Sequence, residues 1–256
     1  MRFATYNVLH GRSIEDGQVD GDRFAAAIAA LDADVLALQE VDRGQVRSGQ
    51  LDLAEIAAQA AGAVGWRFAP AAVGTSNGRW VPAGPGDGER GGPAYGVALL
   101  SRYPVAGWYE MRFKPAPVRS PVLPGSGRIR LLRDEPRVAL GARVETPFGI
   151  VTVAATHLSF VPGWNIAQLA GLATVLRRLP GPRLLLGDLN IPGSLPGLLT
   201  GWTPLARCPT YPTPQPRVQI DHILGSGPLP PVRSAATPFL AISDHRPLVV
   251  DLDRGG

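Results

Sequence analysis

Ile150-Val151-Thr152-Val153-Ala154-Ala155-Thr156-His157 is an apolar run that ends on a histidine, and the same design recurs along the chain. Arg183 to Gly187 leads into Asp188-Leu189-Asn190, and Val35 to Leu38 leads into Gln39-Glu40. Turn or loop residues follow each run. Open α/β sheets generally place their chemistry at the ends of buried strands. The pattern therefore predicts a mixed α/β fold with one polar site assembled at strand ends.

The apolar periodicity extends this interpretation to the whole chain. We expect helices over residues 20–31, 51–61 and 165–179. We expect strands over residues 2–9, 34–38, 66–69, 95–101, 104–113, 137–145, 150–156 and 247–252, with further strands ending at Asp188, Asp221 and Asp244. The sequence contains neither an evident repeat nor an evident linker, so residues 1–256 are interpreted as one catalytic domain.

Two stretches rich in glycine and proline, residues 74–94 and 114–135, lack periodicity and are predicted to be long loops. Loops of this length are uncommon unless they have a function, so we expect them to wall a binding cleft. The second stretch carries Arg119, Arg128 and Arg130. Because a guanidinium presents a planar fork of donors that suits phosphate oxygens, these arginines are candidate substrate-binding residues.

Composition narrows the class of protein. The 256 residues, 45% hydrophobic and 18% charged, fit a soluble globular protein, and the net charge of +4 comes almost wholly from arginine. This charge favours an anionic substrate, although a genomic bias towards arginine explains it equally well. A single cysteine, Cys208, excludes an intrachain disulfide and a cysteine zinc cluster. With no apolar run long enough for a membrane span and no signal-peptide pattern, we expect a cytoplasmic protein; its oligomeric state stays open.

Three of the polar positions have chemistry that can be weighed singly. Glu40 at a strand end would suit a hard divalent cation, or would simply be a solvated charge. Asp188 and Asn190, two residues apart, point the same way on an extended chain and could activate and orient a water, or could form an Asx turn. His157 is either catalytic or a hydrogen-bonded core residue.

The Asp244-His245 pair is a sharper indication. Two adjacent polar side chains point to opposite sides, so a carboxylate can face a metal while the imidazole faces a substrate. Asp221 could then orient His245 and hold its charged form. We expect His222 to be a structural strand residue and His10 to have at most a role at the rim of the site.

The order of the motifs is more specific than any one of them. Along the chain occur Tyr6-Asn7-Val8-Leu9, Leu38-Gln39-Glu40-Val41, Gly96-Val97-Ala98-Leu99-Leu100-Ser101-Arg102, Thr156-His157-Leu158, Gly187-Asp188-Leu189-Asn190, Ile220-Asp221-His222-Ile223 and Ser243-Asp244-His245. This series resembles the endonuclease/exonuclease/phosphatase superfamily, which includes deoxyribonucleases, abasic-site endonucleases, inositol polyphosphate phosphatases and bacterial sphingomyelinases. The resemblance covers residues 2–252.

The resemblance implies an α+β four-layer sandwich, in which two packed mixed β-sheets are flanked by helices. It also implies a phosphoester hydrolase that uses Mg²⁺ or Mn²⁺. By matching motif, Glu40 would be the main metal ligand with Asn7 and Asp244 nearby. Asp188 would activate the water, and Asn190 would orient the water or the phosphate. His245, paired with Asp221, and His157 would stabilise the phosphoryl oxygens as charge builds.

Three functions compete. The first is a phosphodiesterase or phosphatase acting on a small or lipid-derived phosphoester. The second is a Mg²⁺-dependent nuclease on DNA or RNA, which the net charge favours. However, no element that would read a DNA groove is evident. In addition, Leu9 stands at the position of the aspartate in the Asn-x-Asp motif that is typical of abasic endonucleases. The third is a catalytically inactive binding module. The full set of polar residues argues against this third function, because buried charges cost stability that a binding module need not give up.

Overall fold

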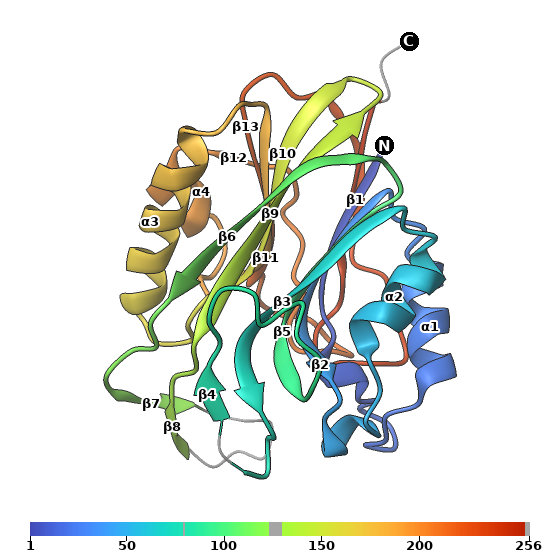
Figure 1. The fold of residues 1–256 in the computed structure, drawn as a ribbon. Helices are drawn as coiled ribbons and strands as arrows, with labels where there is room; N and C mark the ends of the chain where they lie inside the picture. Colours follow the sequence, from blue (N-terminus) through green and yellow to red (C-terminus); the bar gives the residue numbers. More distant parts are fainter. Residues whose placement is uncertain (79, 123–129, 254–256) are drawn as a thin grey trace.

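The computed structural model describes residues 1–78, 80–122 and 130–253, and in them two mixed β-sheets pack face to face (Figure 1). The first sheet has the order β14-β15-β1-β2-β5-β3-β4 and the second the order β12-β13-β11-β10-β9-β6. The first consists of β1 (Arg2–Asn7), β2 (Val35–Arg43), β3 (Gly65–Gly74), β4 (Trp80–Pro82), β5 (Ala94–Ser101), β14 (Val232–Ala236) and β15 (Leu248–Leu252). The second consists of β6 (Val105–Phe113), β9 (Arg137–Thr146), β10 (Gly149–His157), β11 (Arg183–Asp188), β12 (Thr203–Pro204) and β13 (Asp221–Ser226).

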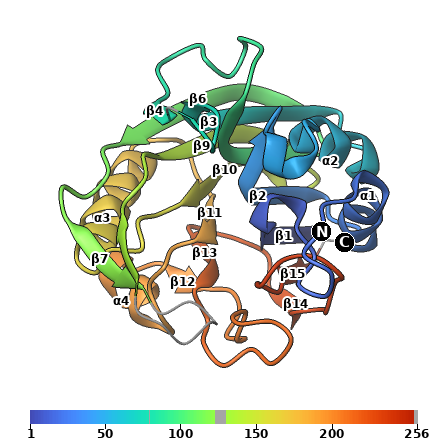
Figure 2. The ribbon, with the colours of Figure 1, turned by 90° about the horizontal axis from the view of Figure 1, so that it is seen from below.

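Helices cover the outer faces of both sheets. Helices α1 (Gly21–Ala30) and α2 (Leu53–Ala61) lie on the first sheet, and α3 (Trp164–Arg177) and α4 (Leu195–Thr200) lie on the second, as the view along the strands shows (Figure 2). The side chain of Asp20 caps α1 by accepting from Arg23 N, and Asp52 caps α2 in the same way. Two 3₁₀ turns, η1 (Leu9–Gly11) and η2 (Val46–Ser48), follow β1 and β2. This arrangement is the predicted four-layer sandwich, so the fold prediction is confirmed.

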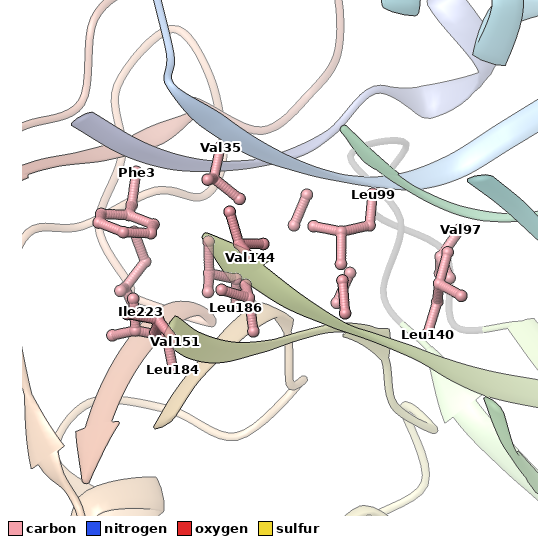
Figure 3. Packing of buried hydrophobic residues seen from close by; sticks show 14 of the residues in the cluster. Phe3, Val35, Val97, Leu99, Leu140, Val144, Val151, Leu184, Leu186 and Ile223 are labelled. Carbon is pink, nitrogen blue, oxygen red and sulfur yellow. The ribbon is translucent and has the colours of Figure 1, made fainter. Parts of the chain in front are cut away.

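The core between the sheets is built by alternation. Alternate residues of each inner strand point into this layer, among them Phe3, Val35 and Leu99 from the first sheet and Leu140 and Leu186 from the second (Figure 3). All five are fully buried. Separate apolar clusters lie between each sheet and its helices. No described helix is long and apolar enough to cross a membrane.

Strand direction brings the polar residues to one edge. Strands β1 and β2 are parallel, as are β10 and β11, so the residues that follow them emerge at the same end. Strand β13 is antiparallel to β11, and Asp188 pairs with Asp221 while His157 pairs with Asp188. Asp221 therefore begins its strand, whereas the sequence pattern predicts that it ends one. An antiparallel strand starts where its parallel neighbours finish, which explains the difference.

Other expectations need correction. Strand β2 continues to Arg43, and Glu40 lies inside it at a register shift between Leu38 and Val41 rather than at its end. Asp244 lies in the loop before β15. The stretch 74–94 contains β4, and the stretch 114–135 contains a hairpin of β7 (Arg119–Val122) and β8 (Arg130–Arg133). These short strands were not predicted, because the prolines and glycines of both stretches are typical of loops.

Candidate active site

The predicted site residues converge at the end of the sandwich where β1, β10 and β11 finish. Asn7, Glu40, Asp188, Asn190, His157, Asp244 and His245 all line one cleft of about 520 Å³. Asp221 lies behind them and is fully buried. Sequence motifs separated by up to 238 residues therefore form a single polar surface.

Gly187 allows this approach of β11 to β10. It has a φ of +155°, and a Cβ at this position would collide with the carbonyl oxygen of Thr156 on β10. A larger residue would push apart the two strands that carry Asp188 and His157. The glycine before the catalytic-type aspartate thus sets the spacing of the site.

Asn7 joins two carboxylates. Its Nδ2 donates to Glu40 Oε1 and to Asp188 Oδ2, both at 3.1 Å, and its Oδ1 accepts from Leu9 N at 3.1 Å. Asn7 is itself 1% exposed. The amide therefore fixes the distance between β2 and β11 at the cleft and partly neutralises the repulsion between the two acids.

A second group links Asp221, His245 and Asp188. Asp221 Oδ2 lies 2.8 Å from His245 Nδ1, and His245 Nε2 lies 3.8 Å from Asp188 Oδ2. The backbone N–H of His245 donates to Ser243 Oγ, and the ring of Tyr211 packs against the imidazole at a centroid distance of 4.9 Å. The imidazole is therefore oriented from behind while its Nε2 faces the Asp188 carboxylate.

His157 and Asn190 also contact Asp188. His157 Nε2 lies 3.4 Å from Asp188 Oδ2 and 3.3 Å from Asn190 Nδ2. Asn190 N donates to Asp188 Oδ1 at 3.0 Å, so the alternative of an Asx turn is also realised here. Asn165, which lies in α3, donates from its Nδ2 to the carbonyl oxygen of Asn190. Asp188 and Asn190 thus form a local turn and also line the cleft.

Burial and neighbouring charges shift the pKa values of Asp188, His245 and His157 in different directions. Burial raises the pKa of Asp188, and the charge of Asp221 raises it further. Burial alone would lower the pKa of His245, but the surrounding carboxylates outweigh it and raise the pKa. Burial lowers the pKa of His157 well below its usual range, and Arg137 lowers it further. The site therefore holds a protonated His245, a neutral His157 and a carboxylate with unusual proton affinity.

Several site residues adopt a left-handed backbone. Glu40 has a φ of 56°, Asn190 of 51° and Ser243, beside Asp244, of 69°. Residues other than glycine seldom adopt this conformation, and asparagine tolerates it best. Such conformations persist where the surrounding structure imposes them, and they gather at functional sites. In Ser243 the hydroxyl donates to the Asn7 carbonyl oxygen, which ties the Asp244 loop to β1.

The candidate substrate-binding arginines have different positions. Arg119 is exposed on β7 and is not among the cleft-lining residues. Arg130 begins β8, opposite Val122, and Arg128 lies outside the described residues. Within the described chain, the stretch 114–135 contributes Leu132, Arg133 and Glu135 to the cleft, and the stretch 74–94 contributes nothing to its lining.

Residues that the sequence analysis did not select also shape the cleft. They include Arg47, Tyr95, Arg137, Phe160 and Tyr211. Trp80 of β4 packs against Tyr95 at 5.1 Å, so the 74–94 stretch supports the wall from outside. No motif marks these residues. The only signal is at Arg137, which is a polar residue at the start of an apolar strand, as His157 is a polar residue at the end of one.

The remaining two histidines lie apart from this chemistry. His222 lies in β13 as expected, its Nε2 is 2.8 Å from the Ile191 carbonyl oxygen, and the residue is 1% exposed. His10 is half-buried in η1 and is not among the residues that line the cleft.

Comparisons place this geometry among known proteins. The model of the Endonuclease/Exonuclease/phosphatase family matches residues 4–245. The solved endonuclease/exonuclease/phosphatase from Beutenbergia cavernae is 25% identical with a TM-score of 0.67, over 100% of this chain and 72% of that chain. Sphingomyelinase C from Streptomyces griseocarneus is 15% identical and a mannosyl-6-phosphatase from Bacteroides thetaiotaomicron is 17% identical, both with a TM-score of 0.61 over 99% of each chain.

These last two likenesses concern the fold alone. No curated protein sequence matches the chain. The family match, in contrast, spans every motif from β1 to His245. Members of this family are metal-dependent hydrolases of phosphoester bonds. The chain belongs to the Endonuclease/Exonuclease/phosphatase family.

Proposed function

We propose that this protein is a divalent-metal-dependent phosphoesterase, with residues 1–256 acting as one catalytic domain. The observation that carries the proposal is the convergence of Asn7, Glu40, Asp188 and His245 on one cleft, with Asp221 held 2.8 Å behind His245. An inactive binding module would have no use for this set of buried ionisable groups.

The donor chemistry fits Mg²⁺ or Mn²⁺. Glu40 and Asp244 offer carboxylate oxygens to the cleft, and hard cations prefer such ligands. Asn7 would position Glu40 and complete the set. The metal, when bound, polarises the phosphoryl group and the attacking water. Asp188, Asp221 and His245 also bring ligand atoms within 4.8 Å of one another. Because Asp221 is hydrogen-bonded to His245, we propose that this group handles protons and does not bind the metal.

The side chains of the cleft have complementary roles. Asp188, whose pKa burial raises, accepts a proton from the attacking water, and Asn190 orients that water or the phosphate. The protonated His245 and the neutral His157 donate hydrogen bonds to phosphoryl oxygens as charge develops in the transition state. Asp221 holds His245 in the charged form. The Asp188–His245 pair titrates as a unit.

The substrate we favour is a small or lipid-derived phosphoester. The cleft is lined by four acids, Glu40, Glu135, Asp188 and Asp244, and by three arginines, Arg47, Arg133 and Arg137. It therefore lacks the excess of basic side chains that would favour a polyanion lying along it. The β7–β8 hairpin beside the cleft exposes Leu131 at 60% and Leu132 at 38%, an apolar surface that suits an acyl chain better than a nucleotide backbone. The fold is shared with a sphingomyelinase and a sugar phosphatase.

A substrate panel tests the proposal. Pure protein with Mg²⁺ would be assayed on plasmid DNA, RNA, nitrophenyl phosphoesters, phosphomonoesters and phospholipids. For the best substrate, kcat/KM would be measured across NaCl concentrations. We expect a shallow dependence; a polynucleotide would lose roughly 0.9 log units per phosphate contact per decade of salt. A steep loss together with cleavage of DNA or RNA would establish a nuclease instead.

A further inference from the structure

One buried arginine in the cleft lacks the hydrogen bonds that burial demands. Arg137 is 4% exposed and lines the cleft with His157. It begins β9, and β9 pairs with β10, the strand that ends at His157. The positive charge of Arg137 therefore lies in the wall of the cleft, on the strand next to the one that carries His157.

The partners of this guanidinium are few. Its Nη2 lies 3.5 Å from Asp134 Oδ1, at the limit of a hydrogen bond, and its Nε has no partner. Asp134 is engaged elsewhere, because its Oδ2 accepts from Ala116 N and from Ser159 Oγ, both at 2.8 Å. A guanidinium has five N–H donors. Among the described residues, Arg137 Nε is therefore buried without an acceptor, and Nη2 makes only one long contact.

Other arginines of the described chain do not share this combination. Arg47 also lines the cleft, but its Nε and Nη2 donate to Asp42 at 2.8 Å, and it stacks on Trp80 and Tyr95. Arg143 has a buried Nε without a partner, yet it is half-buried and lies away from the cleft near the far end of β9. Of these three arginines, only Arg137 is almost fully buried, has a buried Nε without an acceptor and also lines the cleft.

A buried charged donor without an acceptor costs free energy, and structures retain one where a ligand supplies the acceptor. A tetrahedral oxyanion matches the guanidinium fork, since two of its oxygens can accept parallel hydrogen bonds. Burial would lower the pKa of Arg137, but the charges of neighbouring groups, chiefly Glu135, raise it, so the guanidinium stays charged.

We propose that Arg137 is a substrate-binding residue that donates hydrogen bonds to a nonbridging oxygen of the substrate phosphate. The proposal rests on the proposed phosphoesterase function and deepens it. It places the phosphate-binding guanidinium in the wall of the cleft, at the start of β9, and not in the 119–130 segment that the sequence suggested. Its role is distinct from that of His245, whose imidazole is paired with Asp221.

The test compares Arg137→Gln with Arg143→Gln, a control on the same strand. The first measurement is the shift in unfolding temperature that inorganic phosphate causes in EDTA, against chloride at equal ionic strength. We expect phosphate to stabilise the wild type and the control, and to have no effect on Arg137→Gln. An absent shift in the wild type, or an unchanged shift in Arg137→Gln, would overturn the proposal.

The second measurement is kcat/KM on the best phosphoester. We expect a fall of about a hundredfold in Arg137→Gln, the size typical of one lost oxyanion donor, and less than about a threefold change in Arg143→Gln. If Arg137→Gln does not fold, Arg137→Lys is used, because it keeps the charge but not the fork; we then expect a weakened phosphate shift and a fall of about tenfold. Wild-type behaviour of the folded variant would refute the role.

The two proposals fail separately. A wild type that hydrolyses no phosphoester, but is stabilised by phosphate only when Arg137 is present, would end the proposed function and leave the anion site standing. A wild type that hydrolyses a phosphoester with undiminished activity in the folded Arg137 variant would do the reverse.

Discussion

Asp221 Oδ2 lies 2.8 Å from His245 Nδ1, and the aspartate is fully buried at the first residue of β13. Its other carboxylate oxygen, Oδ1, has no hydrogen-bond partner among the described residues. The negative charge of a buried carboxylate with a single hydrogen-bond partner acts mainly on that partner, because no other donor shares it. Asp221 therefore both orients the imidazole and favours its protonated form.

Asp221→Asn should move the alkaline limit of activity to lower pH. The variant keeps a hydrogen-bond acceptor but loses the charge that raises the pKa of His245, so that pKa falls and His245 loses its proton at lower pH. We expect kcat to fall by about tenfold to a hundredfold at neutral pH. Profiles of kcat against pH for both proteins check this; superimposable alkaline limbs would show that the charge of Asp221 does not act through His245.

His222→Ala should affect stability and leave catalysis intact. The imidazole is buried and its Nε2 contacts the Ile191 carbonyl oxygen, which would lose its partner. We expect a loss of about 1–3 kcal/mol in the free energy of unfolding and a kcat close to wild type. His245→Ala is the paired variant and should lower kcat by about a hundredfold or more while remaining folded. The opposite outcome for the two variants would exchange their roles.

Glu40→Gln should stabilise the protein without metal and abolish most activity. Burial raises the pKa of Glu40, so its charged form costs stability at neutral pH, whereas a glutamine can still accept from Asn7. We expect a gain of about 1 kcal/mol, or an increase of roughly 2–4 °C in Tm, when unfolding is measured in EDTA. With Mg²⁺ added, the wild type should gain stability and the variant should not. A variant that is less stable than the wild type in EDTA would contradict this account of Glu40.

His10 should make the protein less stable in acid. Burial, with Arg47 and Arg12, lowers its pKa from 6.5 to about 3. Between these values the unfolded chain binds a proton that the folded chain does not, so stability falls as pH drops through this range. His10→Gln should therefore show a shallower loss of unfolding free energy between about pH 6.5 and pH 4, measured by urea titration. Parallel curves for the two proteins would disprove the link.

The apolar runs predicted a mixed α/β fold, and the family resemblance carried by the order of the polar motifs implied the four-layer sandwich that the structure shows. The sequence placed His157 and Asp188 correctly at the ends of β10 and β11. It could not show that Asp221 begins an antiparallel strand, because an apolar run has no direction. Nor could it show the bulge that turns Glu40 inwards at a φ of 56°, since no local residue type requires it.

Residues fixed only by tertiary contacts stayed hidden. Tyr211 packs on His245, and Arg137 joins the cleft from β9, yet neither belongs to a motif with a spacing of its own. The hairpin of β7 and β8 was obscured by Pro117 and Pro121, which argue against a strand when read singly. The sequence therefore predicts the polar residues at the strand ends. It does not predict the residues from other segments, such as Tyr211 and Arg137, that surround them.

Hydrolysis of a phosphoester by the wild type and by Asp188→Asn, first in EDTA and then after addition of Mg²⁺ or Mn²⁺, tests the central claim most directly. We predict no turnover in EDTA and recovery with either metal in the wild type. With metal, Asp188→Asn should be about a hundredfold or more slower because it loses the group that accepts the proton from water. Full wild-type activity in EDTA, or an Asp188→Asn variant as fast as the wild type, would contradict a metal-dependent phosphoesterase built on this cleft.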